Sequence, residues 1–186
     1  MLIAGLILAF LFGWARGGSL RKLIDLPIRQ VYLLILPLLL EVVQSQLLLR
    51  ADWMTPLLSF GMTILQYLLI FVFVLLNSHI WQVLVYGAGS GLNFLVITAN
   101  AGAMPITETV LELGGSSAKF TALAEGRYFT YEIINESTRL PFLGDVILIP
   151  GILPQCVSIG DILLMIGVFC LVVKGMGKRE ETEDEE

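Results

Sequence analysis

The stretch Pro56–Leu76 constrains the fold of this chain more than any other part of the sequence. Its 21 residues contain no Asp, Glu, Lys or Arg, and Gln66 is the only amide side chain among them. A helix of this length rises about 31 Å, which matches the roughly 30 Å hydrocarbon core of a bilayer. Backbone amides in lipid must be bonded within the segment itself, so the stretch predicts a transmembrane helix.

Four further apolar stretches extend this pattern over most of the chain. The composition agrees, because 56% of the residues are hydrophobic and only 15% are charged, far from the balance of soluble proteins. We therefore predict an all-α integral membrane protein, a five-helix transmembrane bundle with spans at about residues 2–15, 31–49, 56–76, 80–103 and 159–173. Residues 104–157 are too polar to span and too numerous for a plain turn, so we expect a small extracytoplasmic loop subdomain there, with a short helix at Thr107–Leu113.

The basic residues predict the orientation of the spans. A secretory signal has its bases before the apolar run, whereas bases here follow the first run. Bases also follow the last span, so the positive-inside rule places the N-terminus outside the cell and the C-terminus inside. The bases concerned are Arg16, Arg21, Lys22 and Arg29 after the first span, and Lys174, Lys178 and Arg179 after the last.

The C-terminal tail explains the net charge of the chain. The formal charge is -5, but residues 180–186 contribute six carboxylates and no base. A run of this kind is most simply a solvated end. We predict a single transmembrane domain over residues 1–174, followed by a disordered acidic cytoplasmic tail over residues 175–186.

The fourth span presents two different helix faces. At about 100° per residue, one face collects its polar side chains, and lipid would not tolerate them, so this face must meet protein, water or ligand. A second face carries small residues, which let a neighbouring helix approach closely, and we predict helix packing there. The polar face comprises Gln82, Tyr86, Gly89, Ser90, Asn93 and Asn100, and the small face comprises Gly87, Gly91 and Thr98.

Glu41 lies near the middle of the second span, where a charge costs about 2.5 to 3.5 kcal/mol on insertion scales. No basic residue lies within a span to pair with it. Either the carboxyl is protonated, as a satisfied buried acid, or it lines a cavity that admits water. Glu41 and Asn93 each lie roughly 18 to 20 Å along helices that run the same way, so they could meet at one depth. Gln44 shares the Glu41 face of its helix.

Two aspartates are expected at the outer interface. Asp161 follows Ser158 at the spacing of a capping box, and Asp145 suits a turn or a cap. Both roles are structural. Their placement beside Asn100, where the polar face ends, also makes Asp161 a candidate member of a polar site and Asp145 a candidate support for it.

Metal, cofactor and nucleic-acid chemistry find little support in the sequence. The single His79 and the two distant cysteines, Cys156 and Cys170, supply no ligand set for zinc, so we expect no metal and no cofactor. A basic surface interleaved with aromatic residues is absent, so no nucleic-acid partner is expected. No nucleophile and base are spaced for catalysis, and an enzyme is therefore not the leading hypothesis.

Several short motifs resemble those of a known family. The motifs are Leu92-Asn93, Ala99-Asn100-x-Gly102-x-Met104-Pro105, Leu143-Gly144-Asp145 and Ser158-Ile159-Gly160-Asp161. They resemble the signatures of a bacterial family of small multi-span membrane proteins that is classed only as a domain of unknown function. The likeness extends to Val173, and the family usually has a glycine where Ala101 stands. It implies a multi-pass protein of the bacterial plasma (inner) membrane, and it implies no activity.

The polar residues of the spans lead to one main functional hypothesis and two others. We predict a non-enzymatic membrane protein with an outward-facing polar pocket that binds or passes a small polar solute, a lipid headgroup or a proton. The alternative is a structural or accessory subunit of a membrane complex, in which polar groups only lock helices together. The third is an enzyme that acts on a lipid-linked substrate. The expected partners are the bilayer and either a membrane protein or a small polar ligand. The predicted pocket residues are Glu41, Gln44, Asn93, Asn100 and Asp161.

Overall fold

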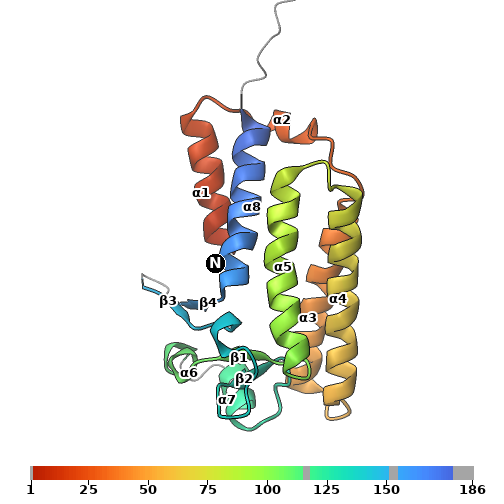
Figure 1. Cartoon of the computed structure of the whole chain (residues 1–186), viewed down its shortest axis with the longest axis vertical. Helices are drawn as coiled ribbons and strands as arrows, with labels where there is room; N and C mark the ends of the chain where they lie inside the picture. Colours follow the sequence, from red (N-terminus) through yellow and green to blue (C-terminus); the bar gives the residue numbers. More distant parts are fainter. Residues whose placement is uncertain (1, 115–117, 151–154, 178–186) are drawn as a thin grey trace, which may run out of the picture.

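The computed structural model describes residues 2–114, 118–150 and 155–177, and most of these residues are helical (Figure 1). The helices are α1 (Leu2–Ala15), α2 (Arg21–Ile24), α3 (Tyr32–Arg50), α4 (Pro56–Leu76), α5 (Trp81–Ala99), α6 (Glu108–Gly114), α7 (Ala118–Ala124) and α8 (Ile159–Met176). Among the described helices, α3, α4, α5 and α8 are long and apolar enough to cross a membrane. These four helices support the predicted multi-pass membrane protein.

Helix α1 is shorter than these four. Its 14 residues rise about 21 Å, so it does not reach the length of a full span. It packs along α8, where Ala9 is buried together with Val172 and Met176. The count of five transmembrane helices therefore remains a prediction, whereas four helices of membrane length are present.

Helices α5 and α8 form the most extensive helix pair of the fold. They run antiparallel, because Gly160 in the first turn of α8 lies against Gly89, and Gly167 lies against the backbone of Tyr86. Since Gly89 is near the middle of α5, helix α8 begins about halfway along α5 and continues past its first turn. Figure 1 shows this offset: α1 and α8 extend beyond α4 and α5 on the side that carries α2.

The chain between α5 and α8 folds into a small subdomain beside the other end of α5 (Figure 1). Strand β1 pairs in parallel with β2, with Met104 opposite Tyr131, and β3 pairs antiparallel with β4, with Ile147 opposite Val157. Helix α6 begins one residue after the start predicted for it. The short elements are β1 (Met104–Ile106), β2 (Tyr131–Ile133), the 3-10 helix η1 (Pro141–Leu143), β3 (Ile147–Ile149) and β4 (Gln155–Val157).

Helix α5 ends at Ala99, four residues before the predicted end of the span. The amide of Gly102 donates to the carbonyl of Ile97 at 2.9 Å, and Ala101 has a left-handed backbone with φ of 53°. This is the Schellman arrangement that stops a helix. An added Cβ on Gly102 would lie 2.8 Å from the Phe60 ring, so glycine also permits a close approach there.

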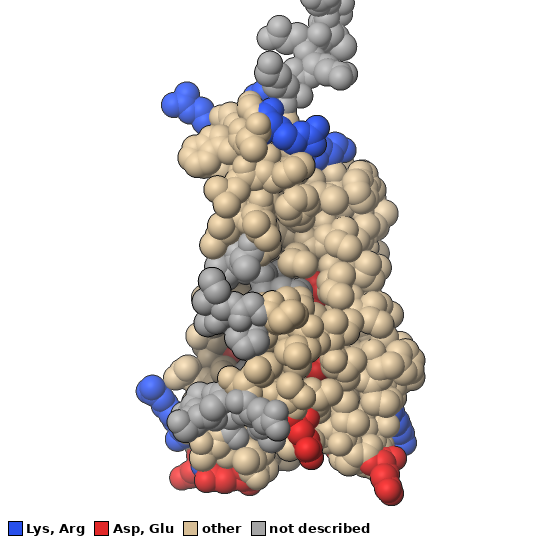
Figure 2. All heavy atoms as spheres, turned by 90° about the vertical axis from the view of Figure 1, so that its left-hand side faces the viewer, with Lys and Arg blue, Asp and Glu red and all other residues tan. Residues whose placement is uncertain are grey.

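The α2 end of the bundle carries basic side chains and contains a buried pair of hydrogen bonds that joins two loops. Figure 2 shows Lys and Arg side chains at both ends of the molecule, whereas the visible acidic side chains lie away from the α2 end, most of them at the opposite end. Asn77, between α4 and α5, is fully buried; its Oδ1 accepts from the Arg29 amide at 2.7 Å, and its Nδ2 donates to the Arg29 carbonyl at 2.9 Å. Residues 178–186, which hold most of the predicted acidic tail, lie outside the described residues.

Candidate functional site

A polar cluster joins the middle of α5 to the start of α8. The Asn93 Nδ2 donates to the Asp161 carboxylate at 2.9 Å, and the Ser158 hydroxyl donates to the Asn93 Oδ1 at 2.9 Å. Ser158 and Asp161 also complete a capping box, because each side chain accepts from the backbone amide of the other. Asp161 thus serves the structural role predicted for it, and the structure also brings it into contact with Asn93.

Glycine makes this cluster possible. A Cβ added to Gly160 would collide with the Asn93 side chain, and one added to Gly89 would lie 2.8 Å from the Leu164 amide nitrogen. The two helices therefore meet backbone to backbone at this level. Such close contact brings the short Asn93 side chain within reach of the first turn of α8.

Gln44 belongs to a second network, between α3 and α4. Its Nε2 donates to the Ser59 hydroxyl at 2.9 Å and to the Thr63 hydroxyl at 3.2 Å, while its Oε1 accepts from the Gln66 Nε2 at 2.6 Å. All four residues are buried. The signal that could have found the partners is their spacing, because Ser59, Thr63 and Gln66 recur at the four- and three-residue intervals of one helix face.

Ring contacts place the two networks at one depth. Gln66 and Tyr67 are neighbours on α4, and the Tyr67 ring lies 5.2 Å from the ring of Phe94, centroid to centroid. Phe94 is in turn the neighbour of Asn93 on α5. We name the two networks together the polar layer, and its members are Gln44, Ser59, Thr63, Gln66, Asn93, Ser158 and Asp161.

Glu41 lies beside the polar layer and remains accessible. On the helical projection it falls between Gln44, which bonds to α4, and Ser45, whose hydroxyl lies 2.6 Å from that of Tyr128. This sector of α3 faces the rest of the bundle, yet Glu41 is exposed. Within the part of the chain that the structure describes, Glu41 has no hydrogen-bond or ion-pair partner.

Asn100 and Asp145 lie nearer to the loop subdomain. Asn100 donates through Nδ2 to the Arg139 carbonyl and accepts through Oδ1 from the Arg139 amide, both at 2.8 Å. The Asp145 amide donates to the Pro105 carbonyl at 2.8 Å, which extends β1. Seven residues, or about 10 Å, separate Asn100 from Asn93 along α5. Of the five predicted pocket residues, only Asn93 and Asp161 form a described hydrogen bond with each other. Gln44 and Asn100 bond to other parts of the protein.

The three residues predicted to pack helices differ in their surroundings. A Cβ on Gly87 would lie 2.6 Å from the Val74 side chain on α4, so this glycine does face a helix closely. Gly91 has nothing within 4 Å of that position. The Thr98 hydroxyl donates to carbonyls of its own helix, at 2.7 Å to Phe94. The close α5–α8 contact uses Gly89, which the periodicity had assigned to the polar face.

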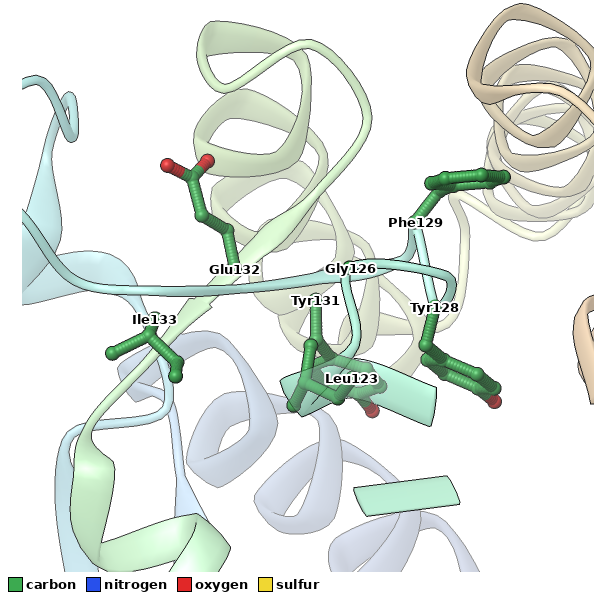
Figure 3. Close-up of a pocket in the computed structure, with 7 residues that line it drawn as sticks. All are labelled: Leu123, Gly126, Tyr128, Phe129, Tyr131, Glu132 and Ile133. Carbon is green, nitrogen blue, oxygen red and sulfur yellow. The ribbon is translucent and has the colours of Figure 1, made fainter. Parts of the chain in front are cut away.

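The loop subdomain contains a pocket of about 320 Å³ near α7 and β2. Figure 3 shows Tyr128 and Tyr131 directed to one side of the chain, and Phe129 and Glu132 directed to the other. The Glu132 carboxylate already accepts a hydrogen bond from Asn135 at 2.8 Å. The lining is otherwise apolar and aromatic, and it includes none of the predicted pocket residues.

Comparison with known proteins places the chain in one family. Residues 25–173 match the model of a family described as a family of unknown function, DUF5317. Neither the curated proteins nor the solved structures include a match to the chain. The matched region contains α3, α4 and α5 and all but the last three residues of α8. The chain therefore belongs to the DUF5317 family of unknown function.

Proposed function

We propose that this protein is a non-enzymatic bacterial inner-membrane protein that binds a small cationic or hydrogen-bond-donating group at Glu41. In this proposal the N-terminus and the loop subdomain are outside the cell and the C-terminus is inside, in accord with the bases at the α2 end. The members of the polar layer and Asn100 hold the helices and the loop subdomain around Glu41. Their hydrogen bonds within the protein support this division of roles.

The observation that carries the proposal is the exposure of Glu41 on the bundle-facing sector of α3. A carboxylate at the depth of the spans is costly, about 2.5 to 3.5 kcal/mol on insertion scales. A bound cation, a proton or a strong hydrogen-bond donor would offset that cost. No basic residue of the four long helices can offset the cost by pairing with Glu41, since Arg50 and Lys174 lie at or near helix ends.

Native mass spectrometry of the detergent-extracted protein tests the proposal. We expect a bound small molecule or lipid on the wild type, lost in Glu41→Gln. Asp52→Asn is the matched control, because it removes an exposed carboxylate just beyond the end of α3. It should keep the bound species. A wild type without any bound species, or equal occupancy in all three proteins, contradicts the proposal.

An accessory subunit of a membrane complex is the second candidate. The observation in its favour is that Gln44, Asn93, Asn100 and Asp161 all bond within the protein, as groups that only lock helices would. In the same experiment, a stoichiometric protein partner that is lost in Glu41→Gln would support this candidate instead.

A further inference from the structure

The long helices of this fold are offset from one another along the bundle axis. The Phe94 ring of α5 lies 5.2 Å from the Tyr67 ring of α4, centroid to centroid. The neighbouring Asn93 accepts a hydrogen bond from Ser158, the N-cap of α8. Helix α8 therefore begins at the level of Tyr67, near the middle of α4. Pro56, the first residue of α4, lies 11 residues, or about 17 Å, beyond this level on the side of the loop subdomain.

At the other end of the bundle the offset has the same sense. Counted from the level of Tyr67, α8 rises about 26 Å to its end at Met176, whereas α4 rises only about 14 Å to its end. Helix α1 follows α8 along this length. An added Cβ on Gly5 would lie 2.8 Å from the Met165 side chain, and one on Gly13 would lie 2.6 Å from that of Met176. Helices α1 and α8 are thus displaced together toward the α2 side, as Figure 1 shows.

The position of the β3–β4 sheet opposes a bilayer placed perpendicular to α4. A bilayer centred on α4 in that way would put the start of α8 at its mid-plane. Strand β4 ends at Val157, one residue before the N-cap of α8, and among the described strands it pairs only with β3. Leu148 of β3 is 49% exposed, so protein does not enclose this sheet. Hydrocarbon offers no hydrogen-bond partner to the free edges of a sheet, and the sheet therefore belongs at the bilayer surface.

The basic residues of the α2 side follow the offset of the helices. Arg16 directly follows α1, and the nearby Ser19 amide donates to the Met176 carbonyl at the end of α8 at 3.0 Å. Arg29 bonds through its backbone to Asn77, directly after α4. These two bases therefore lie at heights that differ by about 12 Å along the bundle axis. Since bases gather at one face of a bilayer, a plane that meets both is inclined to this axis.

The opposite surface slopes in parallel. Asp52 and Trp53, which is 62% exposed, precede α4, whereas Asp161 lies in the first turn of α8, about 17 Å nearer to the α2 side. Charged groups and exposed tryptophans favour the bilayer surface. We infer that the bilayer is inclined to the long helices, so that α1 and α8 share one hydrocarbon layer with α3, α4 and α5, and the β3–β4 sheet lies at its surface. Tilts of up to about 40° occur in membrane proteins. This placement does not depend on a ligand at Glu41.

Spin-label depth measurements in phosphatidylcholine nanodiscs test this placement. Single cysteines, introduced after Cys156→Ser and Cys170→Ser, carry a nitroxide whose collisions with oxygen and with a water-soluble nickel complex report its depth. Ile159 at the start of α8 and Leu68 on α4 are both exposed and lie near the level of Tyr67. We expect the label at residue 159 to lie about 10 Å nearer to the bilayer surface than the label at residue 68. A perpendicular bilayer gives equal depths. Leu148→Cys on β3 replaces Ile159→Cys if that variant does not fold.

A second pair of labels tests the α2 side. Leu11 on α1 and Leu75 on α4 are 56% and 73% exposed. An inclined bilayer buries the label at residue 11 more deeply than the label at residue 75. A perpendicular bilayer gives the reverse order, because α1 ends with α8, about 12 Å beyond α4.

Equal depths in the first pair, or the reverse order in the second, would overturn the inclined placement. A shallow label at residue 159 together with the reverse order in the second pair would indicate local thinning of the bilayer beside α8 instead. Native mass spectrometry of Glu41→Gln decides the proposed function separately, whatever the depths of the labels.

Discussion

Asn93, in the middle of α5, donates a hydrogen bond to the carboxylate of Asp161, in the first turn of α8, at 2.9 Å. The same asparagine also accepts from Ser158, the N-cap of α8, so its side chain holds the first turn of α8 at the level where Gly89 and Gly160 meet. The loop subdomain occupies the length of α5 that α8 leaves uncovered.

We expect Asn93→Ala to lower the free energy of unfolding by about 1 to 2 kcal/mol, because it removes two interhelical hydrogen bonds. Thr98→Val on the same helix is the control. Its hydroxyl donates only to carbonyls of its own helix, and the change should stay within about 0.5 kcal/mol. Unfolding in mixed micelles measures both. Equal effects would show that the α5–α8 cluster contributes little.

Gly89→Ala should destabilise the protein by about 1 to 3 kcal/mol, because the new Cβ would collide with the backbone of α8. Gly91→Ala lies two residues further along and meets nothing within 4 Å. Alanine in an open helix position should stabilise the protein by about 0.5 to 1 kcal/mol. Melting temperatures of the two variants should move in opposite directions. A melting temperature of Gly89→Ala at or above that of the wild type would contradict the contact.

Gln44→Leu should cost about 1 to 3 kcal/mol, because the buried amide of Gln66 loses its acceptor and the hydroxyls beside it lose a donor. Gln46→Leu is the matched control, since Gln46 is exposed on the same helix. Thermal unfolding followed by circular dichroism compares them. The network would be ruled out as a lock between α3 and α4 if both variants melt alike.

Ala101→Gly should stabilise the protein by about 1 kcal/mol, because Ala101 has a φ of 53°, where a side chain is strained. Ala103, two residues further along, lacks a positive φ. Ala103→Gly should therefore give no gain, and the greater freedom of its unfolded chain should make it slightly less stable. Denaturant midpoints of both variants test this prediction. A loss of stability in Ala101→Gly would contradict the left-handed turn.

Stability should fall at alkaline pH. Burial, and after it the negative charges of Asp145 and Glu41, raise the pKa of the Tyr131 hydroxyl. The folded protein then keeps this phenol neutral while the unfolded chain, with a tyrosine pKa near 10, loses the proton. The contribution of the neutral Tyr131 phenol to the free energy of unfolding is complete below about pH 10 and declines as the pH rises further. Above about pH 10, the free energy of unfolding of Tyr131→Phe should fall less steeply with pH than that of the wild type. Tyr32→Phe, which removes an exposed hydroxyl, should show the same pH dependence as the wild type.

The ends of the helices could largely be predicted from local signals. Helix α4 begins at Pro56 because Thr55 caps it, with the hydroxyl accepting from the Leu58 amide at 3.3 Å. Ser158 marks the start of α8 in the same way. The end of α5 was placed too late, because the apolar run continues to Ala103 while the left-handed turn at Ala101 has already stopped the helix.

The partners of the polar groups could not be predicted. Periodicity shows which side chains share a helix face, but it does not show which helix lies opposite. Gln44 and Asn93 therefore seemed suited to one pocket, whereas Gln44 bonds to α4 and Asn93 to α8. The offset of α8 depends on the backbone contact between Gly89 and Gly160, which lie 71 residues apart in the sequence. Such long-range contacts are not encoded in local spacing.

An experimental density map of the protein in lipid nanodiscs would test the central claim most directly. The account predicts non-protein density beside the α3 carboxylate, with a polar atom within hydrogen-bond distance of Glu41. The same map should show Asn93 and Asp161 in contact. A Glu41 side chain packed against protein, with no other density next to it, would contradict the account.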